Sequence, residues 1–194
     1  MNVNRLEAFS DGVLAIIITI MVLELKVPHG DTLNDLTPLL PVFMSYLLSF
    51  IYIGIYWNNH HHLIKTATRV SGPILWANLH LLFWLSLIPF ATGWLGENHF
   101  AAVPAAMYGL ILLMAAIAFF FLQRSILASK GTDSILHQEL GTDWKGKISP
   151  ILYAIGIAMV FWSQWISMGI YILVALIWII PDRRFERAIE GDVS

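Results

Sequence analysis

Long apolar stretches constrain this chain more than any other feature of its sequence. Four stretches of about 20 mostly apolar residues lie within the first 122 residues, and a longer one runs from 148 to 180. Of the 194 residues, 58% are hydrophobic and only 12% are charged, whereas soluble domains carry about 25% charged residues. A water-soluble core cannot bury so much apolar surface. The sequence therefore predicts an all-α, polytopic membrane protein.

The apolar stretches divide into six predicted transmembrane helices. The stretch 148–180 would form a helix of about 50 Å if it were continuous, well beyond a hydrocarbon core of about 30 Å. We therefore divide it at Ser163 and Gln164, with one long tilted helix as the alternative. The predicted spans cover residues 7–25, 37–58, 73–94, 101–122, 148–162 and 165–180, so that 1–194 forms one transmembrane domain.

The basic residues predict the orientation of these spans. With six spans, ten of the eleven lysines and arginines lie on the side that holds both termini, and only Lys26 lies on the other side. Loops rich in lysine and arginine remain in the cytoplasm. We therefore expect a multi-pass protein of the cell membrane with both termini in the cytoplasm. A five-span arrangement would place Arg183, Arg184 and Arg187 outside, which fits this rule less well.

Polar side chains lie at the predicted inner ends of the first three spans. Ionisable groups inside a membrane span are costly and are usually paired or functional. Because these residues lie at a similar depth, we predict that they form one network, which holds the helices together with about 1 kcal/mol per hydrogen bond. Direct contact with a permeating ion is the less favoured alternative. The candidate network comprises Arg5, Phe9, Ser10, Asp11, His60, Asn78 and His80.

Three consecutive histidines, His60 to His62, suggest a metal site or a proton relay as one interpretation. Successive residues on a helix point about 100° apart, so the three imidazoles cannot chelate one ion together. Carboxylate partners are also scarce. We therefore favour interfacial or network roles for these histidines and expect no metal and no cofactor. A membrane enzyme would need spaced histidine pairs and carboxylates, so no enzyme is predicted.

The segment Arg5-Leu6-Glu7-Ala8-Phe9-Ser10-Asp11 matches the Arg-x-x-x-Phe-Ser-Asp pattern that opens the first helix of the transmembrane protein 175 family. The resemblance continues through Thr19 and returns between Trp76 and Trp94, including Asn78, His80 and the step Pro89-Phe90. These proteins are endolysosomal potassium channels and their prokaryotic relatives. The motif occurs once in this chain. In this respect the chain resembles the prokaryotic form of the family, which has one six-helix repeat and assembles as a homotetramer.

The resemblance implies a potassium-permeable channel whose first helices line a central pore. The sequence contains no Thr-Val-Gly-Tyr-Gly filter, and in the family a ring of aliphatic side chains forms the constriction instead. By position, Ile16 matches the constricting isoleucine and Thr19 the hydroxyl-bearing layer beyond it. Ile16, Thr19, Ile20 and Leu23 lie at i, i+3, i+4 and i+7, on one helix stripe. Ordinary helix packing is the alternative interpretation of this stripe.

Glu24 lies near the outer end of the first span. Four such carboxylates around a pore would concentrate cations, although Glu24 could instead pair with Lys26 or face solvent. The expected partners are potassium ions, membrane lipid and further copies of this chain, with no nucleic acid. Proton permeation through the same pore remains open.

A small secondary transporter or proton-coupled cation carrier is the alternative function. It would need an inverted repeat and helices broken at mid-membrane, and Pro89 is the only candidate break in a sequence without a visible repeat.

Overall fold

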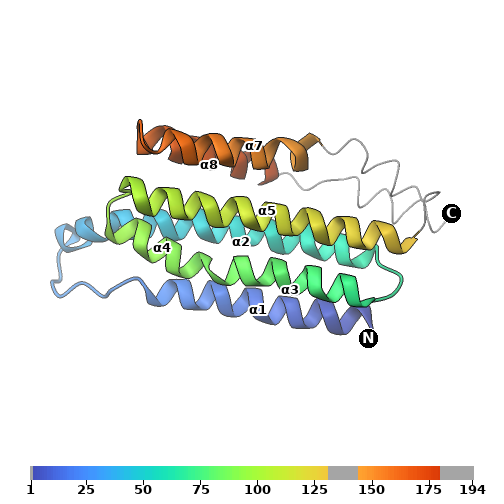
Figure 1. Ribbon diagram of the computed structural model, residues 1–194. Coiled ribbons are helices and arrows are strands. Elements are labelled where there is room, and N and C mark those ends of the chain that lie inside the picture. Colours follow the sequence, from blue (N-terminus) through green and yellow to red (C-terminus); the bar gives the residue numbers. More distant parts are fainter. Residues whose placement is uncertain (1, 131–143, 180–194) are drawn as a thin grey trace.

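The fold is a bundle of long helices that lie side by side with roughly aligned axes (Figure 1). The structure, a computed structural model, describes residues 2–130 and 144–179. Within these ranges the secondary structure is entirely helical, which confirms the predicted all-α class. With the bent pair α3–α4 counted as one, the described residues form six long helices. The elements are α1 (Val3–Leu23), the 3-10 helix η1 (Leu33–Leu39), α2 (Leu40–Lys65), α3 (Gly72–Ser86), α4 (Ile88–Glu97), α5 (Ala102–Lys130), α7 (Trp144–Met159) and α8 (Gln164–Ile179).

The helix ends differ from the predicted span ends by a few residues. The first helix begins at Val3, because the Asn2 side chain caps it by accepting a hydrogen bond from the Asn4 backbone N–H. Apolar residues mark the membrane core, whereas the second helix continues through its polar histidines to Lys65. The predicted division near Ser163 coincides with the turn between α7 and α8. The predicted end at Ile180 and the three C-terminal arginines lie outside the described residues.

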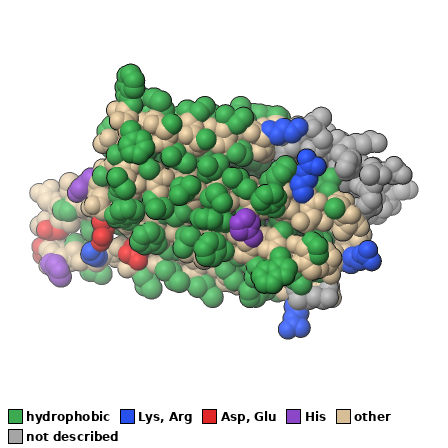
Figure 2. All heavy atoms as spheres, in the orientation of Figure 1, with side chains coloured by type: hydrophobic (Ala, Val, Ile, Leu, Met, Phe, Trp, Pro, Cys, Tyr) green, Lys and Arg blue, Asp and Glu red, His purple; other side chains and the backbone are tan. Residues whose placement is uncertain are grey.

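Four helical segments are long and apolar enough to cross a membrane: Val3–Leu23, Leu33–Lys65, Gly72–Glu97 and Ala102–Ser129. The two C-terminal helices contain 16 residues each, which at 1.5 Å per residue gives about 24 Å and is shorter than the hydrocarbon core. In Figure 2, hydrophobic side chains cover the middle of the visible face. Basic side chains lie mainly toward the end near the start of α1, and acidic ones lie at the opposite end. The chain is thus an integral membrane protein with a charge asymmetry between its two ends.

The third span is bent where α3 meets α4. Pro89 occupies the first turn of α4 and has no N–H to donate to the Leu85 carbonyl. The Leu87 N–H bonds to the Trp84 carbonyl, only three residues back, and α4 then starts at Ile88. Missing hydrogen bonds of this kind are the usual cause of a kink.

A close contact between the start of α2 and the end of α4 depends on a glycine. A Cβ added at Gly96 would lie 2.6 Å from the Cα of Val42, which is backbone and cannot rotate away. We expect Gly96→Ala to lower the free energy of unfolding by about 1–3 kcal/mol, the typical effect of overpacking. The thermal midpoint of the purified protein measures this change.

Gly54 on α2 provides the matched control for this prediction. A Cβ there would meet no atom within 4 Å, so Gly54→Ala should be neutral or stabilising by about 0.5–1 kcal/mol through the better helix propensity of alanine. Equal midpoints for the two variants would show that the helices do not approach as closely as described.

Candidate functional site

The first helix, α1, lies at one edge of the bundle, opposite α7 and α8 (Figure 1). Its inner face contacts α2, α3 and α4. This face is buried and consists of Leu6, Ser10, Leu14, Ile17 and Met21. Within residues 2–130 and 144–179, no other helix covers the opposite side of α1, whose residues are exposed from Arg5 to Leu23.

We call this uncovered side the open face of α1. Ile16 is 59% exposed and Leu23 is 79% exposed, although both are large apolar residues. Thr19 is also exposed, and its hydroxyl donates a hydrogen bond of 2.9 Å to the Ile16 carbonyl. All four residues of the predicted stripe therefore lie on the side that the chain does not bury itself. The open face comprises Arg5, Phe9, Gly12, Ile16, Thr19, Ile20 and Leu23.

A buried hydrogen-bonded chain joins α1, α2 and α3 behind the open face. Asn78 on α3 donates from Nδ2 to the Ser10 hydroxyl oxygen at 3.0 Å. Its amide oxygen lies 2.7 Å from Nε2 of His60 on α2, and Ser10 in turn donates to the Leu6 carbonyl at 2.9 Å. The three side chains are at most 1% exposed. An unpaired polar group at such a position would be costly. These hydrogen bonds therefore fix the rotation of α1 about its own axis and its position along the bundle.

Two further contacts connect α1 to α2 closer to the surface. Trp57 donates from Nε1 to the Asp11 carboxylate at 3.0 Å, and Nδ1 of His61 lies 2.7 Å from Oε1 of Glu7. The sequence analysis did not identify these partners. A signal for them exists, because Glu7 and Asp11 are four residues apart, as are Trp57 and His61. On antiparallel helices, two such pairs meet in reverse order, which is the order observed.

The structure does not bring every candidate of the predicted network together. His80 lies away from Ser10 and His60: its Nε2 accepts a 2.9 Å hydrogen bond from Trp84 Nε1, and its ring stacks on Phe121 of α5. His80 lies two positions after Asn78, which turns the two side chains about 200° apart on a helix. Arg5 and Phe9 also lie outside this network, on the open face of α1.

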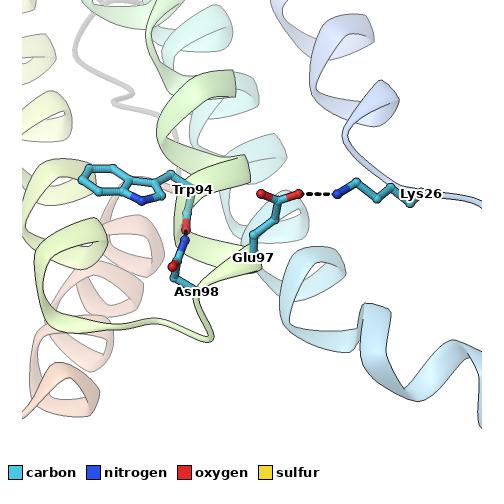
Figure 3. A network of polar contacts seen from close by, with 4 residues as sticks. All are labelled: Lys26, Trp94, Glu97 and Asn98. Carbon is cyan, nitrogen blue, oxygen red and sulfur yellow. Dashed lines mark hydrogen bonds and ion pairs between the residues drawn. The ribbon is translucent and has the colours of Figure 1, made fainter.

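The C-terminal end of α1 is connected to α4 by an ion pair. Lys26 donates from Nζ to Oε1 of Glu97 at 2.6 Å (Figure 3), and this bond together with the charge of Glu97 raises the pKa of Lys26. The sequence left open a pair between Lys26 and Glu24. In the structure, Lys26 pairs with Glu97. The Glu24 side chain is exposed and lies against Gly93 of α4.

Hydroxyl groups form a second buried cluster in the half of the bundle that contains the C-terminal end of α1. Ser49 on α2 lies 2.6 Å from the Thr92 hydroxyl of α4 and 2.9 Å from the Tyr108 hydroxyl of α5. All three side chains are at most 1% exposed. Sequence reasoning missed this cluster, because serine and threonine in membrane helices also bond to their own backbone, as Thr92 does to the Ile88 carbonyl. The cluster fixes α4 against α2 and α5.

These features together define a polytopic helical membrane protein in which one helix has an uncovered face and is fixed from behind by buried polar contacts. Similar proteins place it more narrowly. A family model described as Endosomal/lysosomal potassium channel TMEM175 matches residues 5–89. A potassium channel from Chryseobacterium sp. (strain P1-3) is 57% identical over 190 residues, which cover 98% of this chain and 99% of that protein. The chain belongs to the TMEM175 family.

A solved structure and an animal relative extend this comparison. The crystal structure of a lysosomal potassium-selective channel TMEM175 homolog from Chamaesiphon minutus matches with a TM-score of 0.77 and 31% identity, over 91% of this chain and 95% of that one. The Endosomal/lysosomal proton channel TMEM175 of Gallus gallus is 31% identical over 133 residues, covering 61% of this chain and 26% of that protein. The family consists of ion channels and not of enzymes.

Proposed function

We propose that this chain is the subunit of a potassium-preferring cation channel in the cell membrane, with both termini in the cytoplasm. Four copies place α1 around a central axis, and their open faces line the pore. The observation that carries this proposal is the open face itself, where Ile16 and Leu23 are 59% and 79% exposed, while Ser10 on the buried side of the same helix is held by Asn78. Relatives named potassium channels support the choice of ion.

The proposed pore combines aliphatic rings with one hydroxyl layer. Rings of Ile16, Ile20 and Leu23 narrow the path, and such rings block by dewetting when narrow and pass a partly hydrated cation when wider. The Thr19 hydroxyl uses its proton in the bond to the Ile16 carbonyl, so the lone pairs of its oxygen remain free for a cation. We assign the constriction to Ile16 and the coordinating layer to Thr19. Glu24 at the outer mouth concentrates cations in this proposal.

Potassium flux into liposomes tests the proposed function. We expect the purified full chain to pass potassium down its gradient, faster than sodium, without any coupled gradient. Protein-free liposomes are the control. No potassium flux at any voltage or pH would contradict the proposal.

The same assay separates a channel from a carrier. The bend between α3 and α4 is the broken helix that a carrier would need. However, relatives of this chain are named potassium channels. Potassium uptake that required an opposing proton gradient would favour the carrier. Proton flux through the same pore, as the name of the Gallus gallus relative suggests, is measured with a pH-sensitive dye in the same liposomes.

A further inference from the structure

A basic groove lies at the end of the bundle where α2 ends and α3 begins, away from the open face residues. It has a volume of about 610 Å³ and runs between the α2–α3 loop and α5. Arg69 and Ser71 line one side, and Phe121 and Arg124 line the other. No aspartate or glutamate lines this groove among the residues that the structure describes.

The two arginines of the groove have no acidic partner among the residues that the structure describes. Both are exposed, and neither forms an ion pair or a hydrogen bond with another residue in the described ranges. Arg124 lies over the Phe120 ring at 5.1 Å from its centroid, which holds the guanidinium without using its N–H donors. The Ser71 side chain makes no capping hydrogen bond at the start of α3. The groove thus presents two forked cationic donors and a hydroxyl to one volume, a set that suits a phosphate group.

The groove also borders apolar surface on the side facing the middle of the bundle. Phe121 lies one turn closer to the centre of α5 than Arg124, is 49% exposed, and stacks on His80 of α3. A ligand with a phosphate at the arginines and an apolar part on Phe121 would match both surfaces. Membrane phospholipids have this arrangement, and basic pockets between helices at the membrane surface bind anionic headgroups.

We propose that this groove binds the phosphodiester headgroup of an anionic membrane phospholipid. Among the described residues that line the groove, two guanidinium groups have no carboxylate beside them. This favours a net negative headgroup over a zwitterionic one, because the ammonium of a zwitterionic headgroup finds no partner among these residues. The proposal requires the groove to lie at the membrane surface, and it does not depend on which ion the protein conducts.

Native mass spectrometry of the purified full chain tests this proposal. Phosphatidylglycerol and phosphatidylcholine with identical acyl chains are titrated separately, and the bound fractions are compared. We expect phosphatidylglycerol to bind more tightly. Arg69→Gln and Arg124→Gln should each weaken its binding about fivefold, the effect of one basic residue near a lipid surface, while phosphatidylcholine binding should not change.

Lys65→Gln is the matched control, since Lys65 is exposed at the end of α2 but does not line the groove. Gel filtration verifies the fold of each variant. Arg69→Lys and Arg124→Lys, which keep the charge but lose the forked donors, should bind phosphatidylglycerol more tightly than the glutamine variants and less tightly than the wild type. Glycerol 3-phosphate distinguishes a lipid from a free phosphate: it should not displace phosphatidylglycerol at equal concentration. Equal loss in Lys65→Gln, no loss in the two arginine variants, or full displacement by glycerol 3-phosphate would each overturn the proposal.

Discussion

Replacing Ile16 with asparagine is expected to raise the potassium conductance on the order of tenfold and to weaken the preference for potassium over sodium. The isoleucine is 59% exposed on the open face of α1, where four copies form the proposed constriction. An amide in place of the aliphatic side chain hydrates the ring and lowers the dewetting barrier. A barrier lower by about 1.4 kcal/mol corresponds to a tenfold rate. Single-channel current and reversal potentials in potassium and sodium solutions measure both effects.

Val22→Asn is the matched control for this experiment. Val22 is also an exposed aliphatic residue of α1, at 44%, but it lies about 120° around the helix from Ile16. Its replacement should leave conductance and ion preference unchanged. Unchanged permeation in Ile16→Asn, or a larger change in Val22→Asn, would move the constriction away from Ile16.

Replacing Asn78 with leucine is expected to lower the free energy of unfolding by about 1–3 kcal/mol, the penalty of leaving buried polar groups unpaired. Asn78 is fully buried and bonds to both Ser10 and His60. Its loss leaves Nε2 of His60 without its partner and removes the hydrogen bond that the Ser10 oxygen accepts, although Ser10 still donates to the Leu6 carbonyl. The rotation of α1 is then no longer fixed. The thermal midpoint in detergent measures the change, and the potassium flux should fall as well because the open face is no longer held in position.

A control and a double variant make this prediction specific. Ser86→Ala removes an exposed hydroxyl of α3 that bonds only to the Phe83 carbonyl of its own helix, so its midpoint should match the wild type. Ser10→Ala combined with Asn78→Leu should lose less than the sum of the two single changes, because both remove the same hydrogen bond. Additive losses would mean that the two side chains do not act together.

The helices could be predicted from the sequence because hydropathy and length are local properties. The apolar stretches predicted where the long helices lie, and the division near Ser163 was predicted from the length limit of a membrane helix. The helix ends were less accessible, since capping by Asn2 and the continuation of α2 through its histidines depend on local hydrogen bonds and not on apolar composition.

The sequence gives the depth of each residue in the membrane, and contacts between helices could be predicted only where that depth is sufficient. Ser10, His60 and Asn78 lie at a similar depth on α1, α2 and α3, and hydrogen bonds join them. Depth in the membrane does not tell how a helix is rotated about its axis. The prediction therefore did not show that His80 faces away from Ser10 and accepts a hydrogen bond from Trp84. The i, i+4 spacing of Glu7 with Asp11 and of Trp57 with His61 carries the missing rotational information for α1 and α2. The cluster around Ser49 involves helices far apart in sequence and has no comparable signal.

The central claim, that the open face of α1 lines the pore, is tested most directly with single cysteines. The chain contains no cysteine, so Leu23→Cys and Val22→Cys each introduce one thiol near the outer end of α1. A positively charged, membrane-impermeant thiol reagent is then added during potassium flux into liposomes. We predict that it blocks most of the flux through Leu23→Cys and leaves Val22→Cys unaffected. Block of Val22→Cys with no effect on Leu23→Cys would contradict the claim.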